Sequence, residues 1–308
     1  MKLAVLSDIH GGYVALQTCL AYAFRQKVDA FVFLGDYLGE LAYPRRTMEL
    51  LAELDVKYQC YFMKGNKEDY WLWHAKTPQK ERCWKEVDST TGMLYYVYQQ
   101  LGEKDFAFFK GLSHVRKLQF EGLPAIILCH GSPENIKQDL RPNDEKTLEI
   151  LRKSPTEIIL CGHTHRQGCI SMDNLPKSIC TGDVQEQTSG CEVANKRILN
   201  PGSVGIPLES GGKTQFMILT GENGRWQEEF ISLDYDVARV LAELEEEHLF
   251  DKAPGWCKVT RRVLLEGAPS HGIVLKRAMD LCKEAMGVCN WPDIPEIYWN
   301  KAIDELIG

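Results

Sequence analysis

The strongest constraint on the fold is a series of short apolar runs separated by segments with helical spacing. Residues 2–7 form the first run, residues 13–25 carry apolar side chains at helical spacing, and residues 30–34 form the second run. Continuous apolar strands joined by helices predict a parallel sheet covered on both faces. Similar runs at 58–63 and 157–161, and helical spacing at 45–54 and 143–153, repeat the pattern. We therefore expect an α/β fold.

The rest of the chain divides into three kinds of segment. A hairpin is expected from residues 114–120 to 124–129, and further strands at 197–199, 215–219 and 226–233. An aromatic-rich insertion at about 67–102 is expected to form helices partly over the crevice. Residues 234–308 read as a helical C-terminal appendage without clustered metal or catalytic residue types, with helices near 237–248, 270–286 and 295–307. The expected catalytic domain is residues 1–233.

Composition excludes several classes of protein. The net charge of -7 argues against a broad basic surface that holds a nucleic-acid duplex. No apolar window approaches the length of a membrane span, and no leader pattern opens the sequence, so we expect no membrane association and a cytoplasmic location. The 11 cysteines include no C-x-x-C pair and fit reduced thiols in a reducing compartment.

Polar side chains follow several of the apolar runs, at the points where the expected strands end. Ligands of open α/β sheets gather at the carboxyl ends of strands, so these distant groups are expected to converge. An isolated Asp-x-His would more often be a capping aspartate before a helix, but the recurrence along the chain favours a two-metal site. The donors include no thiolate and suit Mn, Fe, Co, Ni or Zn. The strand-end residues are Asp8, His10, Asp36, Asn66, His130, His163 and His165.

The ordered motifs D-x-H, G-D, G-N, H-G and G-H-T-H resemble those of the calcineurin-like metallophosphoesterase family. The Asp-Ile-His-Gly opening and the segment 200–203 resemble its bacterial and archaeal phosphodiesterase-like branch, which is related to diadenosine tetraphosphatases. The resemblance covers about residues 1–233. It implies a four-layer α/β/β/α sandwich in which two mixed sheets face each other, with a helical insertion and a helical C-terminal tail.

The same resemblance implies a distribution of the metal ligands. Asp8, His10, Asp36 and His165 are expected to hold the first ion, and Asp36, Asn66, His130 and His163 the second, with Asp36 as the bridge. Manganese is the ion expected to support activity. Two such ions polarise a phosphoryl oxygen and lower the pKa of a bridging water, so that hydroxide attacks phosphorus in line. Asp36, His130 and Lys67 are the residues expected to act in catalysis.

Lys67 departs from the family pattern, in which many members have histidine directly after the G-N asparagine. With a reference pKa of about 10.4, lysine is a poor proton donor at neutral pH. We expect Lys67 to supply a positive charge to a substrate whose leaving group is already fairly stable. The alternative is a solvated lysine at a helix start with no catalytic part.

Substrate contacts are expected from Arg166, which follows His165, and from Asn200 and Gly202 in a turn near the metals. Arg45, Arg46 and Arg141 are weaker candidates for the same role. The remaining histidines, His74, His114, His248 and His271, match no motif and read as surface or packing residues. The insertion's aromatic residues read as helical core, with stacking on a nucleobase as the alternative.

The expected function is metal-dependent hydrolysis of a phosphodiester or nucleotide-type bond in a small molecule. A protein or small-molecule phosphomonoesterase is the enzymatic alternative, and a non-catalytic scaffold that binds a partner is the other. The tail is open to three roles: closing the crevice, forming a homodimer surface, or completing the core.

Overall fold

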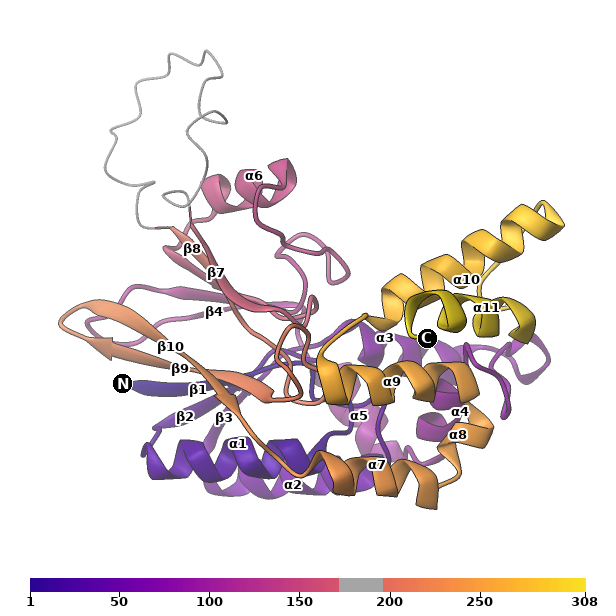
Figure 1. The fold of residues 1–308 in the computed structure, drawn as a ribbon. Coiled ribbons are helices and arrows are strands. Elements are labelled where there is room, and N and C mark those ends of the chain that lie inside the picture. Colours follow the sequence, from indigo (N-terminus) through magenta and orange to yellow (C-terminus); the bar gives the residue numbers. More distant parts are fainter. Residues whose placement is uncertain (172–195) are drawn as a thin grey trace, which may run out of the picture.

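Two five-stranded mixed sheets form the centre of the computed structural model, which describes residues 1–171 and 196–308 (Figure 1). The first sheet has the order β10-β9-β1-β2-β3 and the second β4-β5-β6-β8-β7. The strands of the first sheet are β1 (Lys2–Leu6), β2 (Ala30–Phe33), β3 (Gln59–Phe62), β9 (Thr214–Glu222) and β10 (Arg225–Leu233). Those of the second are β4 (Val115–Leu118), β5 (Ile126–Cys129), β6 (Ile158–Leu160), β7 (Gln167–Ser171) and β8 (Arg197–Pro201).

The expected parallel units are confirmed. β1, β2 and β3 are parallel neighbours, with Val5 opposite Val32, and β5, β6 and β8 are parallel in the second sheet. The expected hairpin of β4 and β5 is antiparallel. Strand β7 was not expected from the sequence and forms the antiparallel edge beside β8. The turn expected at 200–203 starts later, because β8 continues to Pro201 before Gly202 turns with a φ of 81°.

Three apolar cores define the four layers. Leu3 and Val5 of β1 point toward the second sheet and join Leu128 and Leu160 in the core between the sheets. Alternate residues, such as Leu6, point to the helices on the other side. Helix α6 (Glu145–Lys153) covers the outer face of the second sheet. The α/β/β/α order expected from the family resemblance is therefore confirmed.

Helices α1 (Tyr13–Arg25) and α2 (Pro44–Lys57) follow the first two strands and lie under the first sheet (Figure 1). The insertion contains α3 (Asn66–Lys76), a 3-10 turn at Gln79–Glu81 and α4 (Gly92–Gln99), and α5 (Glu103–Gly111) follows it. Its aromatic residues form a packed core, because Trp71 and Trp84 are buried and His74 stacks on Trp84 at 3.8 Å between ring centroids.

The last segment is helical, as expected, but it contains two helices more than the sequence pattern indicated. Its elements are α7 (Val237–Glu246), α8 (Leu249–Lys252), α9 (Pro254–Glu266), α10 (His271–Met286) and α11 (Glu296–Leu306). Asp236 caps α7, and Gly287 ends α10 in a left-handed conformation. Leu244, Val263 and Trp299 pack into the same core as α1 and α4. Within the described residues, no helix is long and apolar enough to cross a bilayer.

Candidate metal centre

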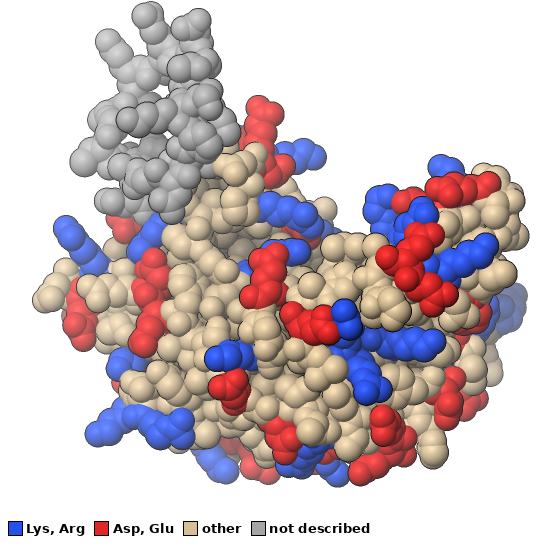
Figure 2. Space-filling model, in the orientation of Figure 1, with Lys and Arg blue, Asp and Glu red and all other residues tan. Residues whose placement is uncertain are grey.

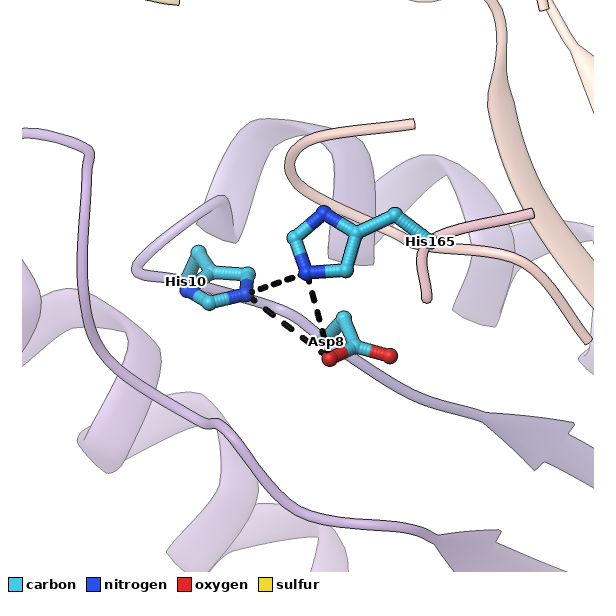
Figure 3. A group of neighbouring side chains, drawn as sticks. All are labelled: Asp8, His10 and His165. Atoms are coloured by element: carbon cyan, nitrogen blue, oxygen red, sulfur yellow. Dashed lines mark hydrogen bonds and ion pairs between the residues drawn. The ribbon is translucent and has the colours of Figure 1, made fainter. Parts of the chain in front are cut away.

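The strand-end residues converge at one edge of the two sheets. Oδ1 of Asp8 lies 3.4 Å from Nε2 of His165 and 3.8 Å from Nε2 of His10 (Figure 3). Asp36 presents Oδ2 to Nε2 of His10 at 3.8 Å and Oδ1 to Nε2 of His130 at 3.5 Å. Asp8, His10 and His165 form one group able to hold a metal ion, and Asp8, Asp36 and His130 form another.

Asn66 and His163 lie beside these two groups. Oδ1 of Asn66 is 3.0 Å from Nε2 of His130. His163 belongs to neither group; its ring lies 5.1 Å from that of His130, and its Nε2 lies 3.4 Å from Oδ1 of Asp139. Its backbone N–H donates to Oδ2 of Asp8. All seven predicted ligands thus occupy one neighbourhood, although the structure leaves the distribution between two ions a prediction.

The imidazoles are oriented as metal ligands usually are. Nδ1 of His130 contacts the carbonyl oxygen of Leu34 at 2.9 Å, and Nδ1 of His165 contacts that of Ile206 at 2.8 Å. Nδ1 of His10 contacts the carboxylate of Glu40. Each ring is therefore held through Nδ1 and presents Nε2 to the centre, the outer contact that fixes a ligating histidine. Oδ1 of Asp8 is buried and has no hydrogen-bond partner among the described residues, so this donor set fits divalent metal ions.

The backbone at the site is unusual. Five of the predicted ligands, Asp8, His10, Asp36, His163 and His165, have φ between 51° and 66°, a left-handed region that non-glycine residues rarely adopt. Each such residue costs on the order of 1–3 kcal/mol and persists only where its surroundings fix it. The loop N–H groups of Asp8 and His10 donate to the carbonyl oxygens of Gly35 and Asp36. The strand-end loops thus hold one another.

Neighbouring charges favour positive charge in this centre. Burial alone would raise the pKa of Asp8, but His165 and His10 hold that pKa well below its usual range. Burial lowers the pKa of His10, whereas Glu40, Asp8 and Asp36 outweigh it and raise the pKa to about 10. The carboxylates therefore create a potential that a bound cation would satisfy.

The centre opens into a hollow of about 280 Å³. Its lining includes Asp139, Arg141 and Arg166, together with Trp256 and His271 from the C-terminal helices. Figure 2 shows this face hollowed between the α6 half and the arm formed by α10, with acidic and basic side chains interspersed rather than gathered in a basic surface.

A sequence profile of the calcineurin-like phosphoesterase family matches residues 1–167. The chain belongs to this family. This phosphoesterase is 22% identical over 256 residues to the uncharacterized protein MJ0912 of Methanocaldococcus jannaschii. The aligned region covers 82% of this chain and 94% of the relative. The metallophosphoesterase of Sphaerobacter thermophilus (21% identity) and the hypothetical protein PH1004 of Pyrococcus horikoshii (18%) share the fold, with TM-scores of 0.65 and 0.66. Each of the two structural alignments covers 87% of this chain and 99% of the chain that it is compared with.

Lys67 of this phosphoesterase lies at the start of α3 but is buried and paired rather than solvated, and its part in catalysis stays a prediction. Its Nζ donates to Oε1 of Glu40 at 2.6 Å, and the other oxygen of Glu40 contacts His10. The backbone N–H of Lys67 donates to Oδ1 of Asp36 at 2.8 Å. Burial lowers the pKa of Lys67, but Glu40 and Asp36 raise it above its usual value. Lys67 is therefore a fixed positive charge.

The predicted substrate residues differ in their surroundings. Arg166 is part of the hollow and pairs through Nε with Glu209 at 2.8 Å. Asn200 donates to the carbonyl oxygen of Gly162 and to Thr164, and its Oδ1 accepts from the N–H of Gly202. These atoms therefore brace the loop that carries His163 and His165, and a contact of Asn200 or Gly202 with substrate stays a prediction.

Three residues near the centre did not stand out in the sequence. Glu68 is fully buried and accepts from the N–H groups of Gly65, Asp36 and Tyr37, which ties together the loops after β2 and β3. Glu40 holds His10. His271, expected to be an ordinary packing residue, stacks on Trp256 at 4.6 Å and is part of the hollow's wall. The tail therefore contributes to the wall of the hollow, as expected if it closes the crevice, one of the three roles left open for it.

Proposed function

We propose that this protein hydrolyses a phosphodiester or nucleotide-type phosphate bond in a small molecule, using two divalent metal ions with manganese as the activating one. The observation that carries the proposal is the convergence of carboxylate oxygens and of imidazoles held through Nδ1 around a buried oxygen of Asp8, which has no hydrogen-bond partner among the described residues. The proposed compartment is the cytoplasm, because the nine cysteines of the described segments are free thiols.

In this proposal Asp8, His10, Asp36 and His165 hold the first ion, and Asp36, Asn66, His130 and His163 the second. Ions bound there supply Lewis acidity to the phosphoryl group and lower the pKa of water. Asp36 is placed between the two sides because its two oxygens face His10 and His130 respectively. Arg166 at the rim binds the substrate phosphate, a role suited to the guanidinium group.

Lys67 and Glu40 act together in this scheme. The buried Lys67 ammonium neutralises Glu40, so that this carboxylate can hold Nδ1 of His10 inside the protein. Its fixed charge borders the hollow above the metal centre, where it would stabilise negative charge that develops on the substrate. Because its pKa is raised, Lys67 donates no proton at neutral pH, which favours a substrate with a stable leaving group.

Glu40→Gln is expected to weaken manganese binding by about 10- to 100-fold, the usual effect of removing a contact that orients a metal ligand. The amide cannot neutralise Lys67, and it holds the imidazole less strongly than a carboxylate. Calorimetric titration of metal-free protein with Mn²⁺ measures the change.

The matched control for this variant is Glu53→Gln, which removes a carboxylate from an exposed pair with Lys57. It is expected to leave manganese affinity as in the unmodified protein. Equal affinities for Glu40→Gln and the unmodified protein would remove the orienting role from Glu40.

The proposed reaction predicts that manganese-loaded protein cleaves bis-p-nitrophenyl phosphate with a kcat/KM at least about tenfold above that for p-nitrophenyl phosphate. Both esters release the same leaving group, so their ratio reports the preference for a diester. A reversed ratio would support the phosphomonoesterase alternative. The scaffold alternative would be supported by two results together. The protein would hydrolyse neither ester nor any other phosphoester in a broad screen, and Asp36→Asn would change only the binding of a partner.

A further inference from the structure

We propose that a small cavity beside the metal centre is a subsite for a flat aromatic ring of the substrate. This inference rests on the proposed hydrolysis and adds the chemical class of one ester group. The cavity, here called the aromatic subsite, has a volume of about 150 Å³ and is bordered by apolar side chains of the insertion and the tail: Tyr70, Met93, Leu94, Trp256, Leu275 and Trp291.

The aromatic subsite adjoins the metal hollow. Glu40, Asn66, Lys67 and Trp256 border both the subsite and the metal hollow. In this proposal, one substituent of a phosphoryl group at the metals reaches past Lys67 into the subsite. The subsite is bordered mainly by apolar side chains, with Glu40, Asn66, Lys67 and Thr90 as its polar ones, which is the composition of a site for an apolar ligand group.

The size and the walls of the subsite fit a single ring. A dry apolar cavity of about 150 Å³ is sufficient to bind benzene. Trp256 is held firmly, with His271 stacked on it at 4.6 Å and Trp299 at 6.0 Å edge-on, so this wall is rigid before ligand binds. Trp291 is 42% exposed, which leaves an aromatic face available at the border of the cavity.

The subsite also accounts for the position of the two helical additions. Tyr70, Met93 and Leu94 come from the insertion, whereas Trp256, Leu275 and Trp291 come from the tail. The sheets supply the predicted metal ligands, and the two additions together supply the apolar walls. Neither addition makes the cavity alone.

The test compares non-hydrolysable phosphonates that share one headgroup. Calorimetry on manganese-loaded full-length protein measures Kd for ethylphosphonate and for phenyl-, benzyl- and phenethylphosphonate. The three aryl compounds place the ring at three different distances from phosphorus. The best aryl compound is expected to bind at least about tenfold more tightly than ethylphosphonate, from the burial of a ring. Equal Kd values for all four compounds would overturn the proposal.

Two variants locate the effect. Trp291→Ala removes one wall and Leu275→Trp fills the cavity, and each is expected to reduce the aryl-to-ethyl affinity ratio severalfold. Trp73→Ala, which removes an exposed tryptophan of α3 outside the subsite, is expected to keep the ratio. A ratio unchanged in both subsite variants would overturn the assignment. Aryl selectivity without hydrolysis of any phosphoester would contradict the proposed function alone, whereas hydrolysis without aryl selectivity would contradict the subsite alone.

Discussion

Replacing Asp36 by asparagine is expected to lower phosphodiester hydrolysis at least about a thousandfold. Asp36 is 2% exposed, and it presents one carboxylate oxygen to His10 and the other to His130. Among the described residues, no other carboxylate is shared between these two imidazoles in this way. An asparagine has one oxygen, no charge and an NH₂ group that would face a metal or an imidazole. The rate with bis-p-nitrophenyl phosphate and the metal content per chain, expected to fall below two ions, measure the effect.

Asp29→Asn is the control, because Asp29 lies just before β2 whereas Asp36 lies just after it. Asp29 is exposed, and its side chain accepts a hydrogen bond from the backbone of Lys2, which an amide oxygen can also accept. We expect this variant to keep both activity and metal. An Asp36→Asn protein that keeps full activity with two ions would show that Asp36 is not the bridge.

Trp299→Ala is expected to destabilise the protein by about 3–5 kcal/mol, the usual cost of truncating a fully buried tryptophan. Trp299 is 0% exposed, its Nε1 donates to Oγ1 of Thr90 at 2.9 Å, and its ring lies against Trp256. The substitution therefore removes apolar contacts and leaves the hydroxyl of Thr90 without this partner. Urea unfolding followed by circular dichroism measures the change in the free energy of unfolding.

Trp73→Ala provides the comparison, since Trp73 is 49% exposed and its removal is expected to change stability by less than about 1 kcal/mol.

The division of the chain into residues 1–233 and 234–308 remains a proposal. Because tail residues share a core with α1 and α4, we expect both segments to unfold in one transition. Two separated transitions, of which Trp299→Ala shifts only that of residues 234–308, would show that the tail folds independently.

The positions of the metal ligands could be predicted because the sequence marks strand ends clearly. The runs before Asp8, Asp36 and His130 are buried strands of parallel units, and parallel strands end at one edge of a sheet. Convergence of these residues therefore followed from local pattern and topology together. The arrangement of two facing sheets followed only from the family resemblance, because apolar periodicity does not say which sheet a strand joins.

Other elements had signals in the sequence that were weaker. Helix α9 begins with Pro254 and is followed by Gly267, which is the usual asymmetry of proline at the first helical position and glycine after the last. Glu68, at the third position of α3, accepts a hydrogen bond from the N–H of Gly65, which is the half of a capping box that a glutamate at this position supplies. Strand β7 has no such mark, since Gln167–Ser171 is short and only partly apolar.

The roles of Glu40, Trp256 and His271 could not be predicted from local sequence. Glu40 lies in an irregular segment, and its contacts with His10 and Lys67 exist only once the loops after β1, β2 and β3 have come together. Trp256 and His271 reach the centre through the packing of α9 on the insertion and of α10 on α9. Tertiary packing, rather than any local motif, therefore brings these three residues to the site.

The central claim is that the seven strand-end residues form a two-metal hydrolytic centre. The most direct measurement is the addition of Mn²⁺ to metal-free protein in increasing molar ratio, with bound metal counted by mass spectrometry and hydrolysis of bis-p-nitrophenyl phosphate followed in the same samples. The account predicts binding that saturates at two ions per chain and activity that appears as the second site fills. Saturation at one ion, or full activity in the metal-free protein, would contradict it.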